Sequence, residues 1–230
     1  MTIEAVDGES SVCVVQFAKV PKLGYVKTRT TPALTLEQAL KLHQRLMGFT
    51  HKQLSSGQWD YYLWLSEPGY DQDVVTLGVE SESIGYQSGS DLGERMYQCF
   101  QQLLQHYQCV VLVGSDCPYL NEEHIAEVVK ALQNTTCVLT PADDGGYVLI
   151  ALSRASDALF QGVPWGGDQV LAVTEEKLRR QGWDYHLMSP LTDIDTAEDL
   201  AQLLNDDISQ VVLGSLRAEL VSQLSVVAVP

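Results

Sequence analysis

The feature that most constrains the fold is an apolar run at residues 110–113, followed at once by Gly-Ser-Asp-Cys-Pro at 114–118. Four aliphatic residues bounded by turn formers predict a strand that is buried on both faces of a parallel sheet. Pro118 lacks an N–H for the ladder, so the strand ends before it. Asp116 is therefore expected at the carboxyl end of a buried strand, where ligands bind in open α/β sheets. A lone aspartate there is also a common turn or cap residue.

Predicted strands and helices alternate along the chain. The expected strands are 12–18, 59–65, 74–79, 110–113, 136–140, 148–152 and 183–188. The expected helices are about 35–54, 91–107, 122–133 and 168–180, a short one from Thr196, and a last one at 207–224. Residues 81–90 are expected to form a loop rich in Ser and Gly. This alternation predicts the α/β class, a layered structure with a mainly parallel sheet. Residues 1–10 are expected to be a loose leader and 11–230 a single domain.

Composition excludes several classes of function. Thirty acidic residues against fourteen basic ones give a net charge of −16, which argues against binding long nucleic acids. No apolar run approaches the roughly 20 residues of a membrane-spanning helix. The acidic start lacks the pattern of a signal peptide. Five scattered cysteines without a CxxC pair indicate reduced core residues and a cytoplasmic protein. Nothing marks Cys117, beside Asp116, as a nucleophile.

Basic residues are concentrated in the predicted strand-to-helix loop at 19–31. This loop holds Lys19, Lys22, Lys27 and Arg29, with Gly24 among them. Glycine lets backbone N–H groups approach an anion, and Lys and Arg supply charge for phosphate oxygens. The loop matches neither of the common glycine-rich phosphate motifs. It is therefore a candidate anion site, with a solvated basic loop as the alternative.

Acidic residues follow three of the apolar strands. They are Asp116, Asp143, Asp144, Asp193 and Asp195. In a parallel sheet these ends meet at one edge, and carboxylates there can hold Mg²⁺ or Mn²⁺ together with substrate phosphates and water. Turn and capping roles are the alternative for 193–196. Asp116 and Asp195 together favour the metal, whereas Asp199, at capping distance from Thr196, belongs to a helix cap.

Two further glycine-containing stretches lie near these acids in the sequence. Gly145 and Gly146 follow Asp144 and permit close passage of a ligand, although a tight turn also needs glycine. Residues 164–167, Pro-Trp-Gly-Gly, form either a lid or acceptor-side loop or a buried tryptophan plug.

Six stretches in this order resemble a known family. They are FAKVPKLGYVKTR (17–29), DLGERM (91–96), GSDCP (114–118), PADDGGY (141–147), FQGVPW (160–165) and DIDTAEDL (193–200). Together they are similar to the glycosyltransferase-A-like family of unknown function, often labelled radical-SAM/selenodomain-associated transferase, over about 12–205. That family is similar in turn to 2-phospholactate and molybdenum-cofactor guanylyltransferases. The resemblance implies the nucleotide-diphospho-sugar transferase fold, a Rossmann-like three-layer α/β/α sandwich.

The resemblance also implies roles for the candidate residues. The 19–31 loop would hold nucleotide phosphates through Lys22, Lys27 and Arg29, with Asp116 as the metal aspartate and Asp195 as a second ligand. Asp144, Gly145 and Gly146 would border the sugar or acceptor, so that Asp116, Lys27 and Asp144 become the expected catalytic residues. Thr30, and Lys22-Leu23 inside the loop, depart from the family pattern without removing a candidate side chain.

The function implied is a metal-dependent transferase that acts on a nucleoside triphosphate or nucleotide sugar and an unidentified small acceptor. Transfer of a nucleotidyl or of a glycosyl group remains open at this point. The alternative is a non-catalytic nucleotide-binding or partner protein that retains the fold. The apolar segment 224–230 packs either on a partner copy, as in a homodimer, or on the domain itself.

Overall fold

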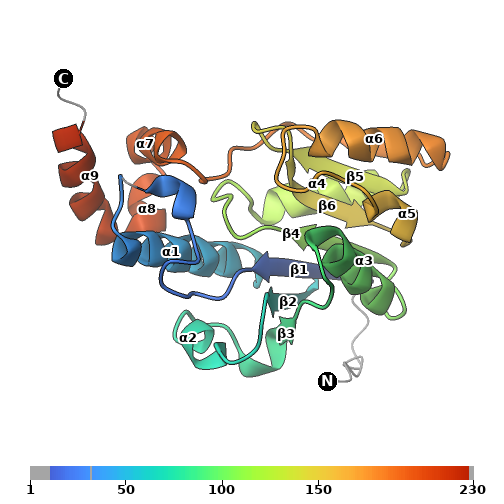
Figure 1. The fold of residues 1–230 in the computed structure, drawn as a ribbon. Helices are drawn as coiled ribbons and strands as arrows, with labels where there is room; N and C mark the ends of the chain where they lie inside the picture. The colour runs from blue at the N-terminus through green and yellow to red at the C-terminus, as the bar shows by residue number, and fades with distance from the viewer. Residues whose placement is uncertain (1–10, 32, 228–230) are drawn as a thin grey trace.

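The computed structural model describes residues 11–31 and 33–227 (Figure 1). The expected leader at 1–10 and the last three residues lie outside the described part. The described residues form a seven-stranded sheet in the order β3-β2-β1-β4-β6-β5-β7. Its strands are β1 (Val12–Ala18), β2 (Asp60–Leu65), β3 (Ile84–Tyr86), β4 (Cys109–Val113), β5 (Cys137–Pro141), β6 (Tyr147–Leu152) and β7 (Tyr185–Leu187).

The pairing confirms a mainly parallel sheet. β1 pairs in parallel with β2 on one side and with β4 on the other, and β2–β3 and β5–β7 are also parallel. Among the described strands, only β6 runs antiparallel to its neighbours. The strand order reverses between β1 and β4, so the crevice at their carboxyl ends is the switch point where α/β folds bind ligands.

Helices cover both faces of the sheet. They are α1 (Leu36–Leu54), α2 (Asp71–Val75), α3 (Leu92–Leu103), α4 (Glu122–Leu132), α5 (Asp157–Phe160), α6 (Val170–Arg180), α7 (Ala197–Asn205), α8 (Ser209–Leu213) and α9 (Leu216–Val227). Two 3₁₀ turns are η1 (Thr28–Thr30) and η2 (Ser81–Ser83). Val14 of β1 packs in one buried cluster with residues of α1 and α4, whereas Val15 packs in another with residues of α3, α5 and α6. Because successive strand residues point to opposite faces, this alternation defines the α/β/α sandwich. A third cluster joins α7, α8 and α9 to the outer side of α1, at the left of Figure 1.

Capping side chains stand at the starts of three helices. Asp91 and Asn121 accept hydrogen bonds from the third residues of α3 and α4, at 2.8 and 2.9 Å. Thr196 and Asp199 form a complete capping box at the start of α7. The α7 capping box confirms the capping role expected for Asp199.

The sequence predictions were wrong at four elements. The expected strand 74–79 is the short helix α2 and a turn, because Asp71 and Asp73 occupy its first turn and only Val74 is buried. The expected loop 81–90 contains η2 and the edge strand β3. α3 ends at Leu103 rather than near residue 107. The single last helix is broken into α8 and α9 at Gly214, whose φ of 54° ends α8.

The core contains the cysteines. All five are free and buried. Burial raises the pKa of the Cys117 thiol to about 12, so this neighbour of Asp116 is not an activated nucleophile. No helix in the described residues is long and apolar enough to cross a membrane.

Candidate functional site

The loop after β1 turns sharply at Gly24. The N–H of Tyr25 donates to the Lys22 carbonyl at 3.1 Å, and Gly24 has a φ of 78°, which favours glycine. The Lys22 ammonium lies 4.1 Å from the centroid of the exposed Tyr25 ring. Lys19 is exposed and Lys22 half-buried in this loop, whereas Lys27, which follows them, is buried.

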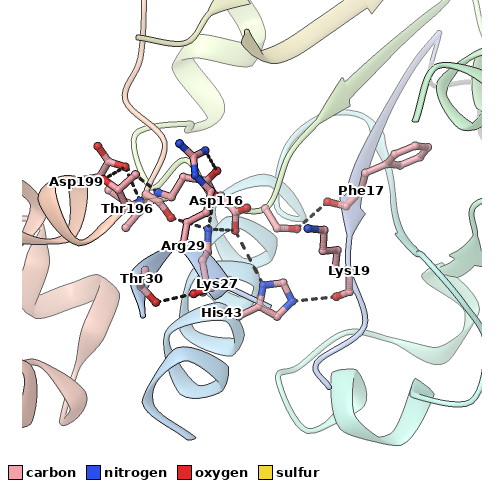
Figure 2. A network of polar contacts seen from close by, with 12 residues as sticks. Phe17, Lys19, Lys27, Arg29, Thr30, His43, Asp116, Thr196 and Asp199 are labelled. Carbon is pink, nitrogen blue, oxygen red and sulfur yellow. Dashed lines mark hydrogen bonds and ion pairs between the residues drawn. The ribbon is translucent and has the colours of Figure 1, made fainter. Parts of the chain in front are cut away.

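Lys27 is the central cation of the site. Its side chain is 2% exposed, and its ammonium lies 2.8 Å from Asp116 Oδ1 and 3.4 Å from Asp195 Oδ1. It also donates to the Ile194 carbonyl at 2.5 Å. Its backbone is left-handed, with φ 50° and ψ 35°, the one positive φ at a non-glycine residue in the described chain. Lys27 thus links the β1 loop to the end of β4 and to the 193–196 turn (Figure 2).

Asp116 stands at the end of β4, as the sequence predicted. Its Oδ1 faces Lys27, while the side chain as a whole remains 36% exposed. Burial alone would raise the pKa of this carboxyl, but Lys27 and His43 outweigh burial and hold the pKa below its usual value. The Asp116 carbonyl accepts from the Ile194 N–H at 2.9 Å, which fixes the 193–196 turn beside it.

His43 of α1 forms the inner wall of the site. It is 3% exposed, its Nε2 lies 2.9 Å from the Lys19 carbonyl, and its Nδ1 lies 4.0 Å from Asp116 Oδ1. Burial lowers its pKa, although the charge of Asp116 acts in the opposite direction. No sequence motif includes His43, so its place in the site is known only from the structure.

A series of buried hydrogen bonds holds Ser115, the neighbour of Asp116, in place. Ser115 donates to the Phe17 carbonyl and accepts from Gln16 Nε2, both at 2.9 Å. Gln16 also donates to the Met47 carbonyl at 3.1 Å, and Tyr61 OH donates to Gln16 Oε1. Gln16 was missed as a supporting residue because it sits within an otherwise apolar strand. The sequence signal that could have indicated this role is the position of Gln16 in the strand beside the switch point.

Arg29 and Asp195 form the outer rim. Arg29 Nη1 lies 2.9 Å from Asp195 Oδ2, with 60% of the arginine side chain exposed. Asp199 accepts from the N–H groups of Asp195 and Thr196 at 3.0 and 2.7 Å and fixes the turn (Figure 2). The structure therefore brings Lys27, Arg29, Asp116 and Asp195 into one charge network.

The remaining acids lie beside this network. Asp144 accepts from the Gly146 N–H at 2.9 Å, and Asp143 accepts from the Thr192 hydroxyl at 2.6 Å. Burial and the charges of Asp144 and Asp195 raise the pKa of Asp193 to about 6. Carboxylates that repel one another in this way form a site suited to a cation.

Gly145 is needed for close backbone packing at this edge. Its φ is 89°, and a Cβ there would lie 2.1 Å from the Asp168 carbonyl oxygen. This close approach seats the 142–146 turn against the segment that leads into α6. Asp144 and Gly146 both line a cavity of about 210 Å³.

The carboxylates fit a divalent ion in part. No group of three or more His, Cys, Asp and Glu side chains arranged to hold a metal occurs among the described residues. Asp195 has one oxygen near Lys27 and the other near Arg29, whereas Asp116 keeps exposed surface and Asp193 lies within its electrostatic reach. Such a set supplies hard oxygen donors but leaves substrate phosphates and water to complete the coordination of Mg²⁺ or Mn²⁺.

The strand order and the strand-end aspartate agree with the nucleotide-diphospho-sugar transferase fold expected from the resemblance. A family model described as "uncharacterized protein conserved in bacteria (DUF2064)" matches residues 49–167, and the chain belongs to this family. A solved protein from Desulfovibrio desulfuricans G20, described as a candidate nucleotide-diphospho-sugar transferase, is 27% identical. The match covers 94% of this chain and 98% of that one, with a TM-score of 0.86.

Two further proteins are similar to this chain. A 2-phospho-L-lactate guanylyltransferase from Methanocaldococcus infernus is 25% identical over 187 residues, which is 80% of this chain and 81% of that protein. A solved 4-diphosphocytidyl-2C-methyl-D-erythritol synthase from Anaerococcus prevotii shares the fold, with a TM-score of 0.54 and 13% identity over 83% of this chain and 93% of that one. These findings confirm the expected superfamily and fold.

Proposed function

We propose that this protein is a transferase of the nucleotidyltransferase type that acts on a nucleoside triphosphate. The observation that carries the proposal is the ion network at the β1–β4 switch point, where Lys27 lies between Asp116 and Asp195. The guanylyltransferase relative supports the same class of reaction. Phosphoryl chemistry needs positioning and charge stabilisation more than it needs covalent groups of the protein, and this network can supply both.

Each side chain has a role in this proposal. Arg29, with Lys22 and Lys19 at the exposed part of the loop and Gly24 shaping its turn, binds phosphate oxygens. Lys27 holds Asp116 in place and offsets its charge. Asp116, with Asp195 or Asp193, would hold Mg²⁺ or Mn²⁺, which would supply positive charge to offset that of the phosphates. Asp144, Gly145 and Gly146 border the acceptor.

A calorimetric screen tests the proposal. We would titrate ATP, GTP, CTP and UTP into the full chain with Mg²⁺, with Mn²⁺ and with EDTA, and repeat the titrations with Asp116→Asn. Metal-dependent binding of at least one triphosphate, weakened tenfold or more in Asp116→Asn, is the expected result. Asp73→Asn, at an exposed residue of α2, is the matched control and should bind as the wild type does. Absence of metal-dependent binding across the panel would overturn the proposal.

Glycosyl transfer from a nucleotide sugar is the second candidate. The Desulfovibrio protein supports glycosyl transfer, because it is described as a nucleotide-diphospho-sugar transferase. The products separate the two reactions, because nucleotidyl transfer releases pyrophosphate from a triphosphate and glycosyl transfer releases a nucleoside diphosphate from a nucleotide sugar. Metal-independent nucleotide binding without turnover would instead identify a non-catalytic nucleotide-binding protein.

A further inference from the structure

The cavity beside Asp144 has mostly apolar walls. It lies between the ends of β4 and β6, the first turns of α3 and α6, and the 165–167 loop. Its volume is about 210 Å³, and the larger apolar side chains around it are those of Phe17, Leu92, Met96, Leu112, Ile150 and Trp165. Gly114, two residues before Asp116, also lines it, so the cavity lies next to the proposed reaction centre.

Trp165 forms one wall of this cavity and packs against two other aromatic rings. Its ring centroid lies 6.5 Å from that of Phe160 in a stacked arrangement and 6.5 Å from that of Tyr147 in an edge-on one. A Cβ at Gly93 would lie 2.5 Å from Trp165 Nε1, so the glycine gives the indole room against α3. The half-buried tryptophan therefore shapes a cavity rather than filling it.

The charges at the cavity are all negative. Among the described residues that line it, Asp144 and Asp193 are the only charged ones, and none is a Lys, Arg or His. At the two helix starts beside it, Asp91 caps α3, and the Leu171 N–H of α6 donates to the Gly145 carbonyl at 2.9 Å, although no side chain caps α6. A phosphate or carboxylate among the apolar side chains of this cavity would find no cationic side chain in the described lining, and burial of an unpaired charge there is strongly unfavourable. A metal at Asp193 would pair with the phosphates of the triphosphate.

We infer that the acceptor is a small alcohol with a compact apolar body and without a phosphate or carboxylate group. The inference rests on the proposed nucleotidyl transfer and specifies its acceptor. The apolar body fills the cavity, and the hydroxyl lies at the Asp144 end. The hydroxyl oxygen forms a bond to the α-phosphorus while the bond from that phosphorus to the bridging oxygen breaks. Pyrophosphate leaves, and the hydroxyl proton passes to the Asp144 carboxylate and then to water.

This acceptor differs from the one in the name of the curated relative. 2-Phospho-L-lactate carries both a phosphate and a carboxylate, and recognition of such groups normally relies on Arg or Lys. The cavity offers apolar surface and carboxylates instead. The two proteins thus share a fold and a class of reaction in this proposal but not an acceptor.

A matched pair of probes tests the inference on the full chain. We would titrate 2-phenylethanol and phenylacetate, which share an aromatic body, and follow binding by calorimetry and tryptophan fluorescence. The alcohol is expected to bind at least tenfold more tightly, with a fluorescence change that is lost in Trp165→Phe. Equal or tighter binding of phenylacetate, or no binding of the alcohol at millimolar concentration, would overturn the inference.

A second variant tests the role of charge. Leu92 lines the cavity and is 45% exposed, so Leu92→Lys is expected to fold and to bring phenylacetate within threefold of the alcohol. Val211→Lys adds the same charge at an α8 residue that is 68% exposed outside the cavity and should leave the preference unchanged. An unchanged preference in Leu92→Lys would contradict the electrostatic argument.

Activity measurements separate the two proposals. Pyrophosphate release with Mg²⁺ and the four triphosphates is expected to rise with 2-phenylethanol and not with 2-phospho-L-lactate. Triphosphate binding combined with turnover of 2-phospho-L-lactate would overturn the acceptor inference and leave the transferase standing. Preference for the alcohol without any triphosphate binding would overturn the transferase and, with it, the acceptor role.

Discussion

At the scale of single residues, Lys27 combines two opposing contributions to stability. Its left-handed backbone is unfavourable for an L-residue by about 1 kcal/mol, whereas its buried ammonium pairs with two carboxylates that are each about one-third exposed. We expect Lys27→Ala to lower the free energy of unfolding by about 2 kcal/mol, less than for a fully buried pair. Lys27→Gly should lower it by about 1 kcal/mol less, because glycine relieves the backbone.

Urea unfolding of the two variants measures this difference. Lys22→Ala, at a half-buried lysine of the same loop, is the control and should cost no more than about 1 kcal/mol, the contribution of an exposed cation–π contact. Equal stabilities of Lys27→Ala and Lys27→Gly would contradict the strain argument.

His43 predicts a pH dependence of stability. Burial lowers its pKa in the folded protein, so between that pKa and the ordinary value near 6.5 the unfolded chain binds more protons. This contribution is fully present above pH 6.5 and is lost as the pH falls through that window. Urea unfolding between pH 8 and pH 5, in EDTA, should show a shallower loss in His43→Gln than in the wild type. Parallel pH profiles would show that His43 gains its proton as easily in the folded state.

The sequence predicted the candidate site in part. Asp116 was identifiable because a buried strand and a proline define its position, and Arg29 because basic residues are rare elsewhere. The burial of Lys27 could not be predicted, since no sequence pattern specifies a left-handed backbone at a lysine. Asp193 and Asp195 alternate along one turn, so the sequence alone could not tell which of them pairs with Lys27 and Arg29.

At the scale of elements, two glycines should respond oppositely to alanine. Gly48 lies inside α1, where a Cβ would meet Leu77 Cβ at an ordinary 3.5 Å, so Gly48→Ala should stabilise the protein by about 0.5–1 kcal/mol. Gly214 between α8 and α9 has φ 54° and ψ −128°, so Gly214→Ala should destabilise it by about 1–3 kcal/mol. Thermal and urea unfolding of both variants would check the signs. Destabilisation in both would mean that α1 packs too tightly at Gly48.

Long periodic elements were predictable and short ones were not. α1 and β1 contain enough apolar residues at regular spacing to be predicted as a helix and a strand. The apolar run at 74–79 is too short to distinguish a strand from a helix. Asp71 and Asp73 favour the helix α2, because acidic residues in the first turn stabilise a helix. The break at Gly214 was hidden because the apolar pattern continues across it.

At the scale of the whole molecule, the net charge of −16 opposes folding. The folded state brings 30 acidic and 14 basic residues close together, and their repulsion is long-ranged at low ionic strength. The screening length falls from about 30 Å at 10 mM salt to about 8 Å at 150 mM. We therefore expect the free energy of unfolding to rise over this range by on the order of 1 kcal/mol, or about 2–4 °C in Tm.

Calorimetric melting in NaCl and in KCl at equal ionic strength would measure this effect, and agreement between the two salts would show general screening rather than binding of one ion. The Lys27 network works in the opposite direction, but its buried ammonium is less accessible to screening than the surface acids are. A Tm that falls as salt is added would therefore show that local ion pairs outweigh the overall repulsion. The same excess of negative charge should prevent binding of duplex DNA even at low salt, where non-specific association is strongest.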